Sequence, residues 1–269
     1  MRKTFSAVLL SIVITTTSSI YAVHAEPLVP SQETQEKLTQ DTLLTTLSPH
    51  IQEAIANYYG YPKQFALFWT KILDIKRKSE GEYTFTVKLQ ARTFEHAHSS
   101  PIGIETITMD VSPFGVKIIN FEHKGDEWEQ KIEQFNKELL NDIIKTFNLD
   151  LTYFKKYEYR QLEYLAEQGN GNFVSIHNII EEIVKELNKD IKPPYKNFIN
   201  PFTFVKDDKA YILFKKADGT NFVYTFKKND NTWIVIKKES KQGKKMPKEL
   251  LWYMYKHLIY IMLGSITMR

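Results

Sequence analysis

Cysteine is absent from all 269 residues of the chain. The absence excludes thiol catalysis, thiolate zinc sites and iron–sulfur clusters, because each needs a sulfur nucleophile or ligand. It also excludes disulfide bonds and a lipid anchor attached to cysteine. A chain of this length buries enough apolar surface to fold without cross-links, so we expect an ordinary hydrophobic core.

Short catalytic motifs are missing too. The sequence contains no Gly-x-Ser-x-Gly, no His-Glu-x-x-His and no glycine-rich phosphate loop. Catalytic sites assembled from distant residues leave no such motif, so an enzyme stays open as an alternative. The sequence favours a protein without enzymatic activity, and it predicts no cofactor.

Long apolar runs are scarce. Residues 5–14 form an apolar run shorter than the roughly 20 residues that span a bilayer. The run follows Arg2 and Lys3 and precedes Val23-His24-Ala25, which places small side chains where a signal peptidase reads. We therefore predict a signal peptide over residues 1–25, cleaved near Ala25, and a mature protein that is secreted or associated with the cell wall.

Charge is unevenly distributed. The formal net charge is +4, and removal of Arg2 and Lys3 would leave +2. Residues 237–248 hold six lysines, of which Lys244 and Lys245 are adjacent. Such a stretch is either a solvated loop or a binding site for an anionic wall polymer or membrane surface. It lacks interleaved aromatic side chains, so nucleic acid is not expected as a partner.

The mature chain begins with a flexible leader over residues 26–34 and an N-terminal α+β unit over residues 35–125. Apolar spacing predicts helix over residues 35–59, with Ser48-Pro49 starting a fresh helix. Strict alternation predicts a strand over residues 83–91. Further strands are predicted over these ranges: 65–75, 105–111 and 116–121.

Residues 126–269 are predicted to hold a helical block, an antiparallel sheet and a terminal helix. The helices are expected over 127–147, over 151–165 and from Ser175 onward, with a terminal helix over 247–263 that Lys256 and His257 interrupt. No transmembrane span is therefore predicted in the mature chain. Strands are predicted over these ranges: 202–205, 210–214, 222–226 and 233–236.

This order predicts an α+β fold of two helix-on-antiparallel-sheet units with a helical block between them. The two units could be a duplicated cystatin-like or NTF2-like fold, or two unrelated α+β units.

The segment Thr93-Phe94-Glu95-His96-Ala97-His98 offers candidate ligands. Two histidines two apart on a strand share a face, so His96 and His98 could bind one metal ion. Arg92 shares that face and would repel the metal. The alternative is that both histidines lie at the rim of the sheet, where His98 forms a hydrogen bond with the backbone of a turn and His96 is exposed to solvent.

Glu95 and Glu105 fall in phase with the buried faces of their strands. If the strands pair, the two carboxylates approach and could act as an acid and base pair. The alternative, which we favour, is that the strand ends before Glu95 and its side chain returns to water, because a buried pair of like charges is costly.

Residues 44–123 resemble an uncharacterised family of small secreted proteins from spore-forming Gram-positive bacteria, known as a domain of unknown function. The resemblance is carried by Thr93, Phe94, Ala97 and His98 and continues through Pro101 to Glu105-Thr106-Ile107-Thr108. It implies an exported protein of that lineage and no particular activity. Residues 127–269 show no such resemblance.

From these observations we predict an exported cell-envelope protein that binds an envelope protein or an anionic wall or membrane surface. The predicted binding residues are Phe94, His98 and Pro101, in a loop over residues 94–105, with Lys244 and Lys245. One alternative is a metal-dependent or two-carboxylate hydrolase centred on residues 95–105. Another is an inhibitor or assembly module that inserts the same loop into a partner.

Overall fold

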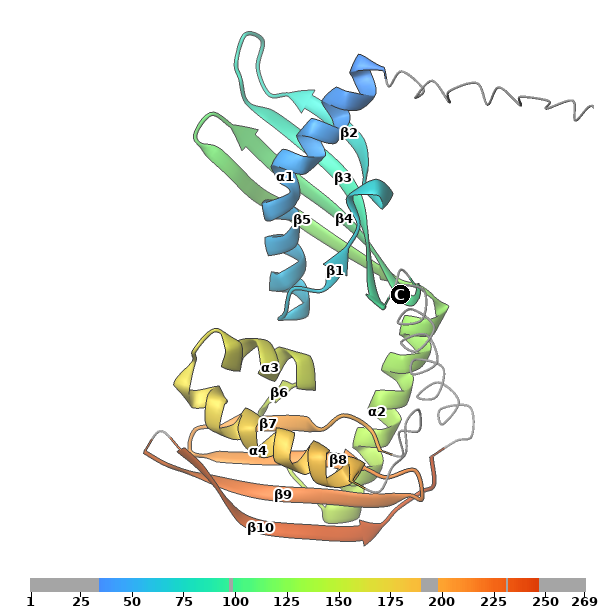
Figure 1. Cartoon of the computed structure of the whole chain (residues 1–269), viewed down its shortest axis with the longest axis vertical. Helices are drawn as coiled ribbons and strands as arrows, with labels where there is room; N and C mark the ends of the chain where they lie inside the picture. Colours follow the sequence, from blue (N-terminus) through green and yellow to red (C-terminus); the bar gives the residue numbers. More distant parts are fainter. Residues whose placement is uncertain (1–33, 97–98, 190–197, 231, 247–269) are drawn as a thin grey trace, which may run out of the picture.

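The computed structural model describes residues 34–96, 99–189, 198–230 and 232–246. The predicted signal peptide, almost all of the leader and the predicted terminal helix lie outside these residues. The described residues form two antiparallel sheets with helices packed on them (Figure 1). The predicted α+β class and its two helix-and-sheet units are therefore confirmed. None of the helices in the described residues is long and apolar enough to span a membrane.

The first sheet carries one long helix on one face (Figure 1). Strands β3, β4 and β5 form a meander, and β1 and β2 both pair with β3. The bounds are α1 (Gln35–Tyr59), β1 (Gln64–Phe65), a 3₁₀ helix (Leu67–Trp69), β2 (Lys71–Arg77), β3 (Phe85–His96), β4 (Ser99–Ser112) and β5 (Gly115–Gly125).

The core of this unit lies between α1 and the sheet. Alternate residues of β3 point toward the helix, as the period of two predicts, and their side chains are buried. Each fully buried aliphatic side chain stabilises the fold by about 1.5–3 kcal/mol relative to an exposed one. The buried set is Leu47, Ile51, Ala54, Ile55, Val87, Leu89, Ala91, Ile107 and Met109.

Helix α1 passes through Pro49 without ending. The prediction that Ser48-Pro49 starts a fresh helix was therefore wrong. A proline removes one backbone hydrogen bond from a helix interior. Burial of Leu47 and Ile51 on either side of Pro49 keeps the helix continuous, because both side chains must face the same sheet.

Two further predictions on this unit need correction. Residues 65–75 do not form one strand, because the 3₁₀ helix Leu67–Trp69 interrupts them. Residues 94–105 do not form a loop: their described residues belong to β3 and β4, which pair from Phe85↔Val111 to His96↔Ser99. The Ser100–Pro101 peptide bond in this hairpin is cis.

The second sheet has the strand order β10-β9-β8-β7-β6 and helices on both faces. The helical block predicted between the two units is therefore part of the second unit. Its bounds are α2 (Glu127–Phe147), β6 (Lys155–Tyr157), α3 (Tyr159–Glu167), α4 (Gly171–Asn188), β7 (Phe202–Lys206), β8 (Lys209–Lys215), β9 (Thr220–Asn229) and β10 (Thr232–Gln242).

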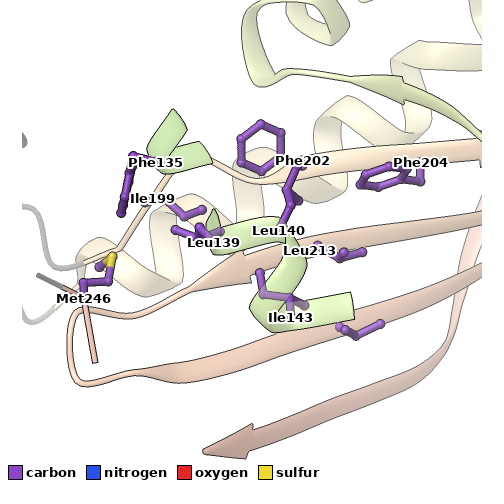
Figure 2. Close-up of a cluster of buried hydrophobic side chains, with 10 residues drawn as sticks. Phe135, Leu139, Leu140, Ile143, Ile199, Phe202, Phe204, Leu213 and Met246 are labelled. Atoms are coloured by element: carbon purple, nitrogen blue, oxygen red, sulfur yellow. The ribbon is translucent and has the colours of Figure 1, made fainter. Parts of the chain in front are cut away.

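Helix α2 covers one face of this sheet with an apolar stripe (Figure 2). Its Leu139 and Ile143 belong to one buried cluster with Phe202 and Leu213 of the sheet. Helices α3 and α4 cover the other face through a second cluster. That cluster includes Leu162, Ile176, Ile180, Ala210, Ile212, Phe214 and Phe226.

A polar contact fastens α2 to the sheet beside the apolar stripe. The Lys215 ammonium, only 3% exposed, donates to Asp142 Oδ2 at 2.5 Å and to Asn221 Oδ1 at 2.8 Å. Asn221 Nδ2 also donates to Asp142 Oδ2 at 2.9 Å. The buried ammonium is therefore paired, as burial of a charge requires.

Several element boundaries differ from the predictions. Residues 151–165 do not form one helix, because Lys155–Tyr157 pairs with β7 as the edge strand β6. Helix α4 begins at Gly171, capped by Asn170, and not at the predicted Ser175. Strand β10 extends to Gln242, so the first half of the predicted lysine loop is an edge strand. Lysines on an edge strand discourage pairing with another chain.

Candidate functional site

Glu105 lies on β4 with no exposed surface. Its Oε1 accepts hydrogen bonds from the Tyr59 hydroxyl at 2.7 Å and the Thr93 hydroxyl at 2.8 Å. Its Oε2 lies 3.0 Å from His123 Nδ1. Residues from α1, β3 and β5 thus surround one carboxylate, and a buried carboxylate needs such partners to stay in the fold.

The imidazole of His123 joins Glu105 to helix α2. Its Nε2 lies 3.4 Å from Glu129 Oε2, in the first turn of α2. Glu129 Oε1 accepts a hydrogen bond from Lys63 Nζ at 3.0 Å. Lys63 is 3% exposed, and its ammonium also lies 4.2 Å from the centre of the Tyr59 ring.

Glu95, at the end of β3, continues the network toward α3. Its Oε1 accepts a hydrogen bond from the Tyr61 hydroxyl at 2.9 Å and lies 3.8 Å from Lys63 Nζ. Its Oε2 lies 3.5 Å from the Arg160 guanidinium, which belongs to α3. We name this connected set of side chains the junction network; its members are Tyr59, Tyr61, Lys63, Thr93, Glu95, Glu105, His123, Glu129 and Arg160.

The junction network connects the first helix-and-sheet unit to the second. Gln161 of α3 donates from Nε2 to the carbonyl of Tyr59 at 2.8 Å, at the end of α1. Gly60 follows Tyr59 with φ of +76°, a left-handed conformation that ends the helix and turns the chain toward Lys63. The end of α1, the first turn of α2 and the first turn of α3 are therefore held around one set of charges.

A glycine makes room for the buried carboxylate. A Cβ on Gly103 would lie 2.5 Å from Thr93 Oγ1 and 2.6 Å from the Tyr59 hydroxyl, and closer still to Glu105 Oε1. These distances are shorter than any ordinary contact with a carbon atom. Glycine at position 103 is thus required by the close approach of Glu105 and Tyr59 rather than by backbone conformation.

The tyrosines of the network are held in their neutral form. Burial raises the pKa of the Tyr59 hydroxyl far above its ordinary value, and the hydrogen bond to Glu105 raises it further. Burial, followed by the charge of Glu95, likewise raises the pKa of Tyr61. Both hydroxyls therefore act as hydrogen-bond donors to carboxylates at all physiological pH values.

The favoured prediction, that the strand ends before Glu95 and its side chain returns to water, was wrong, because β3 runs to His96 and the Glu95 side chain is only 19% exposed. The other prediction, an approach of Glu95 and Glu105, takes an indirect form. The strands do pair, and both carboxylates enter the same network, but the described contacts connect them through Lys63, Glu129 and His123. Each carboxylate has its own donors. The arrangement gives each carboxylate hydrogen-bond and charge partners and positions helices; a catalytic role for Glu95 and Glu105 stays a prediction.

The other predicted site residues lie as follows. His98 is outside the described residues, and His96 is placed only by its backbone at the end of β3. Over the described ranges, no group of three His, Asp or Glu side chains could hold a metal ion. Phe94 is 5% exposed and Pro101 is buried. Because both side chains are buried, a partner that binds this hairpin would have to contact its other residues.

Lys244 and Lys245 follow β10 and are exposed. The amide of Lys244 donates to Asp142 Oδ2 at 3.2 Å, so the backbone of this segment is fixed while its side chains remain exposed to solvent.

Sequence reasoning missed Tyr59, Lys63, His123 and Glu129. Tyr59 and Lys63 lie within an aromatic-rich stretch that fits an ordinary core. His123 alternates with the exposed Glu122 and Lys124 on β5, and that parity was the available signal of its inward direction.

Residues 39–124 match a family described as "Protein of unknown function (DUF3888)". The match covers the first sheet and α1, and it agrees with the resemblance to a domain of unknown function over residues 44–123. No curated protein matches the chain. The comparisons thus show a similarity to this family over residues 39–124 and give no activity.

Proposed function

We propose that the protein is an exported, non-enzymatic binding module of the cell envelope. The observation that carries this proposal is the complete enclosure of Glu105 by Tyr59, Thr93 and His123. These residues, whose side chains could take part in acid–base chemistry, instead hold helices in place. Binding is then left to the exposed surfaces that these helices and sheets present.

Export is supported by the sequence of residues 1–25, which has the charged start, apolar run and small-residue cleavage pattern of a signal peptide. Substitution Ala25→Arg tests it, because a bulky charge at this position blocks cleavage. The unchanged chain should appear outside the cell or in the wall fraction with Glu26 as its first residue, and the variant should remain as the precursor. An unchanged chain recovered intact from the cytosol contradicts export.

The proposed partner is an envelope protein or an anionic surface. An anionic surface is supported by the lysines in and after strand β10, which we name the basic edge. Lys237, Lys238 and Lys241 on β10 and the exposed pair Lys244 and Lys245 lie close together in the chain. Each lysine near an anionic surface contributes about 1 kcal/mol, reduced by salt.

Sedimentation with purified cell-wall material tests the basic edge. Binding at physiological salt should be retained by the unchanged protein and lost in the double variant Lys244→Glu with Lys245→Glu. Lys71→Glu with Lys117→Glu is the matched control, because both lysines are exposed on the first sheet. Equal loss in both variants would show that net charge alone drives binding. Recovery of one envelope protein, with no binding to wall material, would identify a protein partner.

A further inference from the structure

Three lysines form a row across the second sheet. Lys206 of β7 is paired with Lys209 of β8, and Lys209 is also paired with Lys227 of β9. Ile234 of β10 completes the row opposite Lys227. Neighbouring strands lie about 4.8 Å apart, so three ammonium side chains leave the sheet side by side. Like charges directly opposite each other destabilise a strand pair.

The row lies on the α2 face of the sheet but is not covered. Lys206 is two residues from Phe204, whose side chain packs in the cluster under α2, so both point to the same face. Lys206, Lys209 and Lys227 are nevertheless exposed. The apolar stripe of α2 covers the rows that contain Phe202 and Leu213, farther along the strands.

No carboxylate of the described residues forms a direct ion pair with the row, although the Asp150 carboxylate attracts Lys206 at longer range. Among the ion pairs of the described residues, none involves Lys206, Lys209 or Lys227. Neighbouring lysines do have partners, as Lys237 Nζ lies 2.9 Å from Glu239 Oε1. The row therefore carries positive charge that no direct ion pair of the described residues neutralises.

Two lysines of the row contact aromatic rings. The Lys206 ammonium lies 5.2 Å from the centre of the Tyr153 ring, and the Lys209 ammonium lies 4.9 Å from that of Tyr211. Such contacts contribute about 0.5–1 kcal/mol at exposed sites and restrict the side chains. Because lysines occupy these rings, the rings are not free platforms for stacking nucleic-acid bases.

We propose that Lys206, Lys209 and Lys227 form a binding site for a linear polyol-phosphate chain, with successive phosphates meeting successive ammonium groups. The site is separate from the basic edge and rests on the proposed function only in placing such a polymer within reach. A narrow chain fits the row better than an anionic bilayer does. The exposed carboxylates of Asp207, Asp208 and Asp230 occupy the adjoining hairpin turns and would face the phosphates of a flat surface.

A synthetic glycerol-phosphate oligomer with a fluorescent end group is the probe, with binding measured by anisotropy at several salt concentrations. The triple variant Lys206→Gln, Lys209→Gln, Lys227→Gln should bind about a hundredfold more weakly than the unchanged protein. The slope of log Kd against log salt should fall by about 2, because about three fewer counterions are released. Lys71→Gln with Lys117→Gln and Lys137→Gln removes the same charge from exposed lysines elsewhere and should leave the slope unchanged.

Three results would overturn the site. Equal weakening in the row variant and the control variant assigns binding to net charge. Tighter binding to a thymidine oligonucleotide than to the oligomer assigns the row to nucleic acid. Row-dependent binding to phosphatidylglycerol vesicles, without binding to the oligomer, assigns it to membrane. Because the assay uses purified protein, failure of export leaves its result unchanged, and the Lys244 and Lys245 variants test the basic edge separately.

Discussion

His123 Nδ1 lies 3.0 Å from Oε2 of Glu105, a carboxylate that has no exposed surface. The other nitrogen of the same ring faces Glu129 of α2 at 3.4 Å. One side chain on β5 thus connects the centre of the first sheet to the helix that leads into the second unit. The network is expected to fix the angle at which α2 leaves the sheet.

Glu105→Gln tests this network. The variant keeps the shape of the side chain but replaces an ionic acceptor with a neutral amide, and its NH₂ group then faces hydroxyl donors. We expect a loss of about 3 kcal/mol in the free energy of unfolding, measured by urea denaturation. Glu122→Gln, on the exposed face of β5, is the control and should change stability by less than about 0.5 kcal/mol. A loss no larger than the control's would mean that the network does not stabilise the fold.

Gly103→Ala tests the close approach of Glu105 and Tyr59. The added Cβ has no space among three side-chain oxygens, so these groups must separate and lose their hydrogen bonds. We expect destabilisation of about 2–4 kcal/mol by thermal or urea denaturation. Gly171→Ala, at the start of α4, is the matched control because nothing lies within 4 Å of its added Cβ. If the two variants are equally stable, the packing described around Gly103 is incorrect.

Asp142 predicts how stability depends on pH. Burial alone would raise the pKa of its carboxyl, but hydrogen bonds from Lys215, Asn221 and the Lys244 amide outweigh burial and leave the pKa below its ordinary value. A carboxyl whose pKa is depressed in the folded state stabilises that state above the unfolded pKa of about 3.9. That stabilisation is lost as the pH falls through the folded-state pKa.

The measurement is the free energy of unfolding between pH 7 and pH 2. Stability should decline below about pH 4, and the Asp142→Asn variant should show a smaller decline over this range. Asp208→Asn, in an exposed turn, serves as the control. A decline in Asp142→Asn as steep as in the unchanged protein would assign the acid sensitivity to other carboxylates.

Lys209→Thr tests whether repulsion within the lysine row lowers the free energy of unfolding. Lys209 has a lysine opposite it on each side, so its removal relieves two repulsions, and threonine is favourable in strands. The substitution also removes the contact of Lys209 with the Tyr211 ring, which is weakly dependent on salt. We therefore expect the stability of the variant relative to the unchanged protein to fall by about 0.5 kcal/mol from low to high salt, as salt screens the repulsion. The same variant should bind the glycerol-phosphate oligomer more weakly. A stability difference between the two proteins that does not change with salt would contradict the repulsion.

The sequence was most informative where one local rule acted alone. Alternation in residues 83–91 predicts a half-buried strand, and β3 has its core residues on that parity. The turns at Pro113-Phe114 and Asp218-Gly219 follow from residues that favour turn conformations. Prediction failed at Pro49 and in residues 151–165, because contacts with a sheet overrode local preferences there.

The candidate site could be predicted only in part. The in-phase positions of Glu95 and Glu105 place both on the buried side of paired strands, but no pattern in the chain says which donors meet them. Those partners include Lys63, His123 and Arg160, which are up to nearly a hundred residues apart in the chain. Residues so far apart in the chain are brought together by tertiary packing, and no regular spacing in the sequence reveals their contact.

The sequence by itself determined the absence of thiol chemistry and the helix and strand periods, since these depend on residue type and on neighbours in the chain. The export signal that we propose rests on the sequence alone. Only the tertiary structure decided that Glu105 is enclosed and that three lysines stand in one row. Both follow from strand register, which sets which residues of different strands face each other and which faces helices cover.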